Sequence, residues 1–180
     1  LCGRTIRTIV DGEIDDILFE RFGHEDESFV MENRFKTITI DDYLEMIRKK
    51  TAVLIQTCCI MGAIVAGASD EHRQIITEFG HNLGQAFQIR DDILDVFGNV
   101  KKFGKQIGKD IIEKKMGNIL LLKATDQLVG DDKARLTQIL QGSEEVTSDI
   151  VAEVIALINK TNAAEEAEQL AEGHEREDHR

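Results

Sequence analysis

The chain has 180 residues, of which 42% are hydrophobic and 31% charged, so it can bury a core without disulfides or a structural metal. Its 22 basic and 34 acidic side chains give a formal net charge of −12, which excludes binding of nucleic acid through general charge. Proline and tryptophan are absent, and the aromatic residues are eight Phe and one Tyr. This composition favours long helices over a β-sandwich or barrel.

The expected elements follow the apolar periodicity and the helix-capping residues. In chain order we predict a helix over 3–22, an irregular segment over 23–38, a helix from 40 to about 66, a break at 67–70, a helix over 71–97, a loop over 98–109, and helices over 110–128, 132–141, 146–160 and 161–172. No segment alternates with a period of two, so the predicted class is all-α. We expect one domain over 1–172 and a solvated tail over 173–180.

Residues 51–68 carry no charge, and their length is at the lower limit for crossing a bilayer. A glutamine and two glycines within the segment favour a buried core helix, so we predict no membrane span. The three cysteines, Cys2, Cys58 and Cys59, are odd in number and include an adjacent pair, which is not the pattern of a disulfide framework. We predict that they are small buried side chains in a reducing, cytoplasmic environment.

The most informative segment is 81–98, HNLGQAFQIRDDILDVFG. At 100° per residue, Gln88, Asp91, Asp92 and Asp95 fall within about 100° of one another on an otherwise apolar helix. A stripe of this kind can simply meet water. However, like charges at this spacing repel, and they lie at the negative end of the helix dipole. A divalent cation would turn both effects into attraction, so the stripe predicts Mg²⁺, with Mn²⁺ as the alternative, bridging to a diphosphate.

A cationic loop follows this stripe directly. The sequence GNVKKFGKQIGK over 98–109 combines glycines with four lysines, among them Lys105, and Lys114 and Lys115 come shortly after it. Such a loop is often only a solvated turn. Its place after an acidic helix end favours a phosphate-binding loop, because glycines permit close backbone approach and ammonium groups balance phosphate charge.

These segments resemble the trans-isoprenyl diphosphate synthases, the polyprenyl synthetase family. FQIRDDILDVFG is similar to the second aspartate-rich motif of that family, and GKQIGKD and EKK follow it in the expected order. KKTA at 49–52 and GEIDD at 12–16 resemble two upstream motifs, with Glu13 where the family has Gln. The sequence EKKMGNI is most similar to short-chain members from archaea.

The resemblance implies an isoprenoid-synthase-type helical bundle around a central cavity. It also implies Mg²⁺-dependent head-to-tail condensation of isopentenyl diphosphate with an allylic diphosphate, in a homodimer. The implied metal ligands are Asp91 with the support of Asp92 and Asp95. The implied diphosphate-binding residues are Lys50, Lys105 and Lys115. Thr51 and Gln88 would lie near the forming carbocation, Asp16 would face the cavity, and Phe87 would contribute to the isopentenyl diphosphate site.

One departure from the family pattern limits this reading. The first aspartate-rich motif, DDxxD, does not occur upstream of the stripe. We therefore expect the N-terminal helices of the fold to be missing from this chain, and the chain alone not to catalyse. The alternatives are a non-catalytic subunit of a heteromeric synthase, a terpene cyclase of the same fold, and a plain helical bundle with an accidental acidic stripe. Cyclases generally lack the GKQIG loop.

Overall fold

The computed structural model describes residues 1–21, 23–98 and 107–177, and this part of the chain contains helices and no β-strand. The elements are α1 (Cys2–Phe19), α2 (Ser28–Asn33), α3 (Ile40–Ile47), η1 (Arg48–Ala52), α4 (Val53–Val65), α5 (Asp70–Phe97), α7 (Lys109–Ile112), α8 (Ile119–Gln127), α9 (Gly130–Gln141), α10 (Ser148–Ile158) and α11 (Ala163–Glu177). The predicted all-α class is confirmed.

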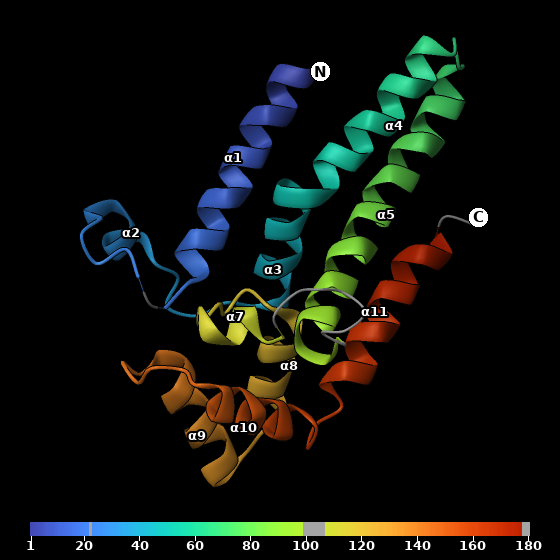
Figure 1. Cartoon of the computed structure of the whole chain (residues 1–180). Helices are drawn as coiled ribbons and strands as arrows, with labels where there is room; N and C mark the ends of the chain where they lie inside the picture. Colours follow the sequence, from blue (N-terminus) through green and yellow to red (C-terminus); the bar gives the residue numbers. More distant parts are fainter. Residues whose placement is uncertain (22, 99–106, 178–180) are drawn as a thin grey trace.

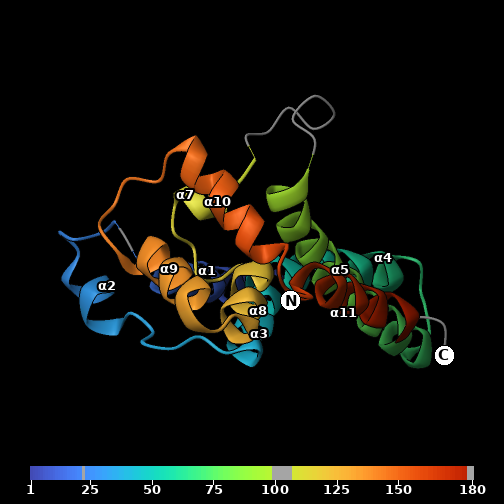
Figure 2. The same cartoon turned by 90° about the horizontal axis from the view of Figure 1, so that it is seen from below.

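Two groups of helices make up the molecule (Figure 1). The long helix α5 runs beside α4 in the opposite direction, and α11 packs along another side of it. Helix α1 packs on η1 and α4. The shorter helices α7 to α10 gather at the C-terminal end of α5, as the view from below also shows (Figure 2).

The core lies where these groups meet. Its largest fully buried side chains include Tyr43 of α3, Ile89 of α5 and Leu120 of α8, each with 0% of its surface exposed. Each fully buried side chain of this size stabilises the fold by about 1.5–3 kcal/mol. The core therefore fixes the position of the last turns of α5, which carry the acidic stripe.

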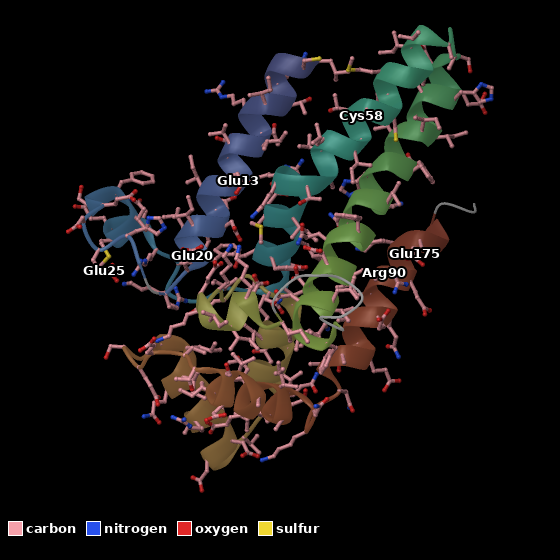
Figure 3. All side chains as sticks on the ribbon, viewed as in Figure 1. Glu13, Glu20, Glu25, Cys58, Arg90 and Glu175 are labelled. Carbon is pink, nitrogen blue, oxygen red and sulfur yellow. The ribbon has the colours of Figure 1, made fainter. Side chains whose placement is uncertain are left out.

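Ion pairs hold α11 against α5. Arg90 donates from Nε to Glu175 at 2.8 Å and from Nη1 to Glu168 at 2.6 Å. Figure 3 shows Arg90 and Glu175 extending toward one another from the two helices. Helix α11 continues through 173–177, beyond the helix end predicted at 172. Arg90 explains this extension, since its partner Glu175 lies within it.

Two further predictions about elements were wrong. The segment predicted to be irregular over 23–38 contains α2, a helix of six residues. The helix predicted over 110–128 is interrupted between α7 and α8, where Lys114 has the left-handed conformation with φ of 52°. Few residues other than glycine adopt that conformation. The interruption turns the chain so that Lys114 and Lys115 face different parts of the molecule.

The predicted buried core helix over 51–68 was also wrong, because Thr57 is the buried residue of α4 while its large apolar side chains are half-buried or exposed. None of the described helices has the length and apolar character that crossing a bilayer requires. The three cysteines are free, but their predicted burial was wrong, because Cys2 and Cys58 are exposed and Cys59 is half-buried.

Three helices expose a second apolar face to the surroundings. The exposed large apolar side chains of these helices are Ile6, Val10 and Ile14 on α1, Leu54, Met61, Ile64 and Val65 on α4, and Ile75, Phe79, Leu83, Phe87, Leu94 and Phe97 on α5. By contrast, in the described part of the chain after α5, Val129 is the exposed large apolar side chain. The exposed apolar surface is thus concentrated on α1, α4 and α5.

Candidate functional site

A pocket of about 430 Å³ opens between the end of α1, η1, the last turns of α5 and the segment that contains α7. Its lining residues are Asp16, Met46, Ile47, Lys50, Gln88, Asp91, Asp92, Asp95, Lys109, Asp110, Lys115 and Gly117. Seven of the ten residues predicted from the sequence are in this set. The structure therefore brings together residues that are up to 99 positions apart in the chain.

Asp16 joins the two predicted diphosphate-binding lysines that the structure describes. Lys50 Nζ lies 2.6 Å from Asp16 Oδ2, and Lys115 Nζ lies 3.5 Å from the same oxygen. Burial lowers the pKa of both lysines, but Asp16 and other nearby carboxylates outweigh it, so both pKa values lie above the ordinary value. Both ammonium groups are therefore charged at neutral pH, and Asp16 is their shared counter-ion.

Two glycines, one on α1 and one on α5, allow these helices to pack closely against η1, which contains Lys50 and Thr51. A Cβ atom on Gly12 of α1 would lie 2.4 Å from the backbone nitrogen of Lys50. Only a glycine permits the backbones of α1 and η1 to lie this close. One helical turn after Gly12 comes Asp16, which therefore faces Lys50. The wide π-helical turn of η1 is itself a feature that is frequent at functional sites.

The same arrangement recurs on the other side of η1. A Cβ atom on Gly84 of α5 would lie 2.4 Å from Ala52 Cα. Gln88 follows one turn later, and its Oε1 accepts a hydrogen bond of 2.8 Å from the hydroxyl of Thr51. Thr51 lies outside the pocket lining, and this bond holds its hydroxyl against Gln88, which lines the pocket.

Asp92 is buried, with 4% of its surface exposed. Its Oδ2 accepts hydrogen bonds from the Tyr43 hydroxyl at 2.9 Å and from the Ile119 backbone nitrogen at 3.1 Å. Its Oδ1 accepts a bond of 3.1 Å from Gln88 Nε2. Burial raises the pKa of Asp92 to about 7, although the donors from Gln88, Ile119 and Tyr43 counteract the rise.

Asp95 fixes the start of α7. Its two carboxylate oxygens accept from the backbone nitrogens of Lys109 and Asp110 at 3.2 and 3.1 Å. Burial and the charge of Asp110 raise the pKa of Asp95 to about 6. Asp110 in turn accepts a hydrogen bond of 2.9 Å from Asn118 Nδ2. Asp95 thus has a structural role at the rim of the pocket.

The adjacent residues Lys114 and Lys115 point to different places. Lys114 is buried, and its Nζ donates to the backbone oxygens of Gly142 and, at 2.6 Å, of Glu144 beyond the end of α9. Lys115 reaches the pocket. The left-handed backbone of Lys114 makes this divergence possible.

Several contributors were missed in the sequence. Tyr43, Asp110 and Asn118 complete the hydrogen-bond network behind the pocket. Asn118 accepts from the Leu120 backbone nitrogen as the N-cap of α8, and an Asn just before an apolar run is a signal that could have found it. Tyr43 gives no such signal, because its partner lies 49 positions away.

Of the predicted residues that the structure describes, Thr51 and Phe87 lie outside the pocket lining. Phe87 lies outside the lining set and is 57% exposed. Lys105 lies outside the described residues. In addition, no cluster of three or more Asp, Glu, His or Cys side chains suited to hold a metal ion exists within the described ranges.

The comparisons with known proteins identify the family. The family model for polyprenyl synthetase matches residues 1–158. The chain belongs to the polyprenyl synthetase family. The short chain isoprenyl diphosphate synthase of Methanocaldococcus jannaschii is 39% identical over 120 residues, which are 67% of this chain and 36% of that relative. The heptaprenyl diphosphate synthase component 2 of Geobacillus stearothermophilus is 35% identical over 130 residues, which are 72% of this chain and 39% of that relative.

The solved structures support the same family membership. A geranylgeranyl pyrophosphate synthase from Corynebacterium glutamicum, solved in complex with isoprenyl diphosphate and magnesium, superposes with a TM-score of 0.80 at 26% identity. The superposition covers 98% of this chain and 46% of that structure. This member of the polyprenyl synthetase family therefore spans less than half the length of these two relatives and of this structure.

Proposed function

We propose that this chain forms part of a prenyltransferase that condenses isopentenyl diphosphate with an allylic diphosphate in a divalent-metal-dependent, head-to-tail reaction. The observation that carries the proposal is the convergence of Lys50, Lys115 and the acidic stripe of α5 on one pocket, in a member of the polyprenyl synthetase family. Ionisation of an allylic diphosphate leaves a highly charged anion beside a carbocation, and cations stabilise the leaving group.

Lys50 and Lys115 bind the diphosphate in this proposal. In the structure both are paired with Asp16. A diphosphate carries more negative charge than one carboxylate, so it can replace Asp16 as the partner of both ammonium groups, which already line the pocket. Lys105, from the glycine-rich loop, is proposed as a third cation, and Phe87 as part of the isopentenyl diphosphate site.

The donor set in the pocket fits a metal ion that is held largely by the diphosphate. Asp91, Asp92 and Asp95 all line the pocket, and Asp92 is buried while Asp91 is only partly buried. Mg²⁺ commonly takes one or two carboxylates together with substrate phosphates and water. We propose Asp91 as the direct ligand, with Asp95 in a supporting role through water. When bound, the ion would act as a Lewis acid on the diphosphate.

Thr51 and Gln88 are proposed to face the forming carbocation. Their mutual hydrogen bond holds both side chains in fixed orientations beside Lys50. Oriented dipoles stabilise a developing charge because they need no rearrangement during the reaction.

We also propose that the domain is incomplete without further helices. The exposed apolar faces of α1, α4 and α5 are larger than scattered surface residues would be. The matched structure from Corynebacterium glutamicum is more than twice as long as the region shared with this chain. Helices that carry the remainder of the family fold would cover these faces, and the assembled protein is proposed to be a homodimer in the cytoplasm.

One relative favours a second candidate function. The name of the Geobacillus stearothermophilus relative describes it as a component of a heptaprenyl diphosphate synthase. This chain would then act as one subunit of a heteromeric synthase, with or without a catalytic pocket of its own. Pyrophosphate binding to the pocket distinguishes a working site from a purely regulatory subunit.

The test is isothermal titration of the chain with pyrophosphate in the presence and absence of Mg²⁺. We expect Mg²⁺-dependent binding that is weakened at least about tenfold by Lys50→Ala and by Asp91→Asn, since each removes a charge that faces the phosphates. The matched controls are Lys133→Ala and Asp131→Asn, which lie on the exposed start of α9. Equal effects of the site and control variants would contradict the proposal.

A further inference from the structure

A chain of hydrogen bonds runs from η1 through α5 to α3 and α8. The Thr51 hydroxyl donates to Gln88 Oε1 at 2.8 Å, and Gln88 Nε2 donates to Asp92 Oδ1 at 3.1 Å. The other oxygen of Asp92 accepts from the Tyr43 hydroxyl and from the backbone nitrogen of Ile119. Every bond in the chain therefore points toward Asp92.

The direction of these bonds has a chemical cause. Both oxygens of Asp92 accept hydrogen bonds, Oδ1 from Gln88 and Oδ2 from Tyr43 and Ile119, which is the pattern of a carboxylate acting as acceptor only. Gln88 must therefore turn its NH₂ group toward Asp92, which leaves its oxygen facing Thr51. The Thr51 hydroxyl then donates its proton to the hydrogen bond with Gln88, so the lone pairs of the Thr51 oxygen point away from Gln88. The orientation of two side chains is thus determined by a third that is buried behind them.

We propose that Asp92 is a positioning residue for Gln88 and Thr51 and that Tyr43 holds it in place. The inference rests on the proposed prenyltransferase function, in which these two side chains face a carbocation. It assigns Asp92 a role different from that of its neighbour Asp91. Asp92 is 4% exposed and both of its oxygens accept bonds from protein donors, whereas Asp91 is only partly buried at the pocket wall.

The first experiment measures the orientation of Gln88 without any ligand. Its side-chain amide resonances are assigned by their loss in Gln88→Leu, and their hydrogen exchange is compared with that of the exposed Gln141. We expect slower exchange for Gln88 in the wild-type chain and at least about tenfold faster exchange in Asp92→Asn, because Asn presents its own NH₂ group to Gln88. Unchanged exchange in Asp92→Asn would overturn the inference.

The second experiment uses two probes of the same shape and different charge. Dimethylaminoethyl diphosphate carries an ammonium group where isopentyl diphosphate has a neutral carbon, so the ratio of their affinities in the presence of Mg²⁺ measures the preference for a cation. We expect Asp92→Asn to lower this ratio about tenfold while pyrophosphate affinity stays within about twofold of the wild type. Asp91→Asn should weaken binding of both probes and of pyrophosphate.

The outcomes separate the possible failures. If Asp92→Asn weakens pyrophosphate as strongly as Asp91→Asn does, Asp92 serves the metal ion and the inference is wrong. If the wild-type chain does not bind pyrophosphate with Mg²⁺, the proposed function is wrong. The hydrogen exchange of the Gln88 amide still tests whether Asp92 orients Gln88, because that experiment uses no ligand. If Asp92→Asn does not fold, Tyr43→Phe replaces it, because this variant removes one donor to Asp92. The inference then requires that Tyr43→Phe exchanges its Gln88 amide hydrogens faster than the wild type and keeps the same pyrophosphate affinity.

Discussion

Gly84 and Ala52 lie so close that a Cβ atom on residue 84 would stand 2.4 Å from Ala52 Cα. This contact sets the distance between α5 and η1, and Gln88 and Thr51 meet one turn further along α5. The glycine thus determines whether a hydrogen bond of the candidate site can form.

We expect Gly84→Ala to destabilise the chain by about 1–3 kcal/mol, since the added methyl group has to push the two backbones apart. Urea denaturation measures this loss. The matched control is Gly62→Ala in α4, where a Cβ atom meets nothing within 4 Å. There the better helix propensity of alanine should stabilise the chain by about 0.5–1 kcal/mol. Equal effects of the two variants would contradict close packing at Gly84.

Asp16→Asn should have opposite effects on stability and on binding. The variant leaves Lys50 and Lys115 without their shared counter-ion, which we expect to cost about 1.5–3 kcal/mol of folding free energy. The same loss removes the anion that competes with a diphosphate, so pyrophosphate should bind more tightly in titration calorimetry.

The control for Asp16→Asn is Asp132→Asn, which breaks the exposed pair with Lys160 and should change stability by less than about 1 kcal/mol. Weaker pyrophosphate binding by Asp16→Asn would indicate that Asp16 orients the lysines for the ligand instead of competing with it.

The raised pKa of Asp92 predicts a pH dependence of stability. Its ordinary value of 3.8 in the unfolded chain rises to about 7 on burial, so between these values the folded state binds more protons than the unfolded state. The stabilisation that Asp92 contributes is therefore complete below pH 3.8 and is lost as the pH rises through 7.

Asp92→Asn cannot titrate. We expect it to remove at least about 1 kcal/mol of the stability difference between acidic and alkaline pH, because each pKa unit corresponds to about 1.4 kcal/mol. Urea midpoints on either side of neutrality measure the difference. Parallel pH profiles for the wild type and the variant would show that Asp92 has the same pKa in both states.

The exposed apolar faces predict that the isolated chain binds a hydrophobic dye in its native state and associates with itself as its concentration rises. The double variant Phe79→Gln and Leu83→Gln should lower both signals and leave the free energy of unfolding, measured by urea denaturation, within about 0.5 kcal/mol, because both side chains are 40% exposed. Val129→Gln, at an isolated exposed position, is the control. If a second copy of the chain covers these faces, light scattering after size-exclusion chromatography would show a dimer of constant mass, and not association that grows with concentration.

The helices and the acidic stripe could be predicted because both depend on periodicity along one helix. Asp91 and Asp95 are three and seven positions from Gln88, and this spacing alone places them on one face. The different surroundings of Asp91 and Asp92 could not be predicted in the same way. They depend on Tyr43 and Ile119, which lie far away in sequence.

The interruption between α7 and α8 escaped prediction for a local reason. The sequence around Lys114 carries no proline, and a lysine gives no signal for a left-handed backbone. The conformation is held by contacts of the Lys114 side chain with Gly142 and Glu144, which only tertiary structure provides. Propensity argues for a continuous helix, and packing overrides it.

The different directions of Lys114 and Lys115 connect the pocket to a remote turn. One ammonium group is fastened to the turn that follows α9, and the next peptide unit delivers the other to the pocket. The position of the Lys115 ammonium group therefore depends on a turn that lies far from it in the sequence. Because Lys114 Nζ donates to backbone oxygens of that turn, a change in the course of its backbone would displace Lys115 as well.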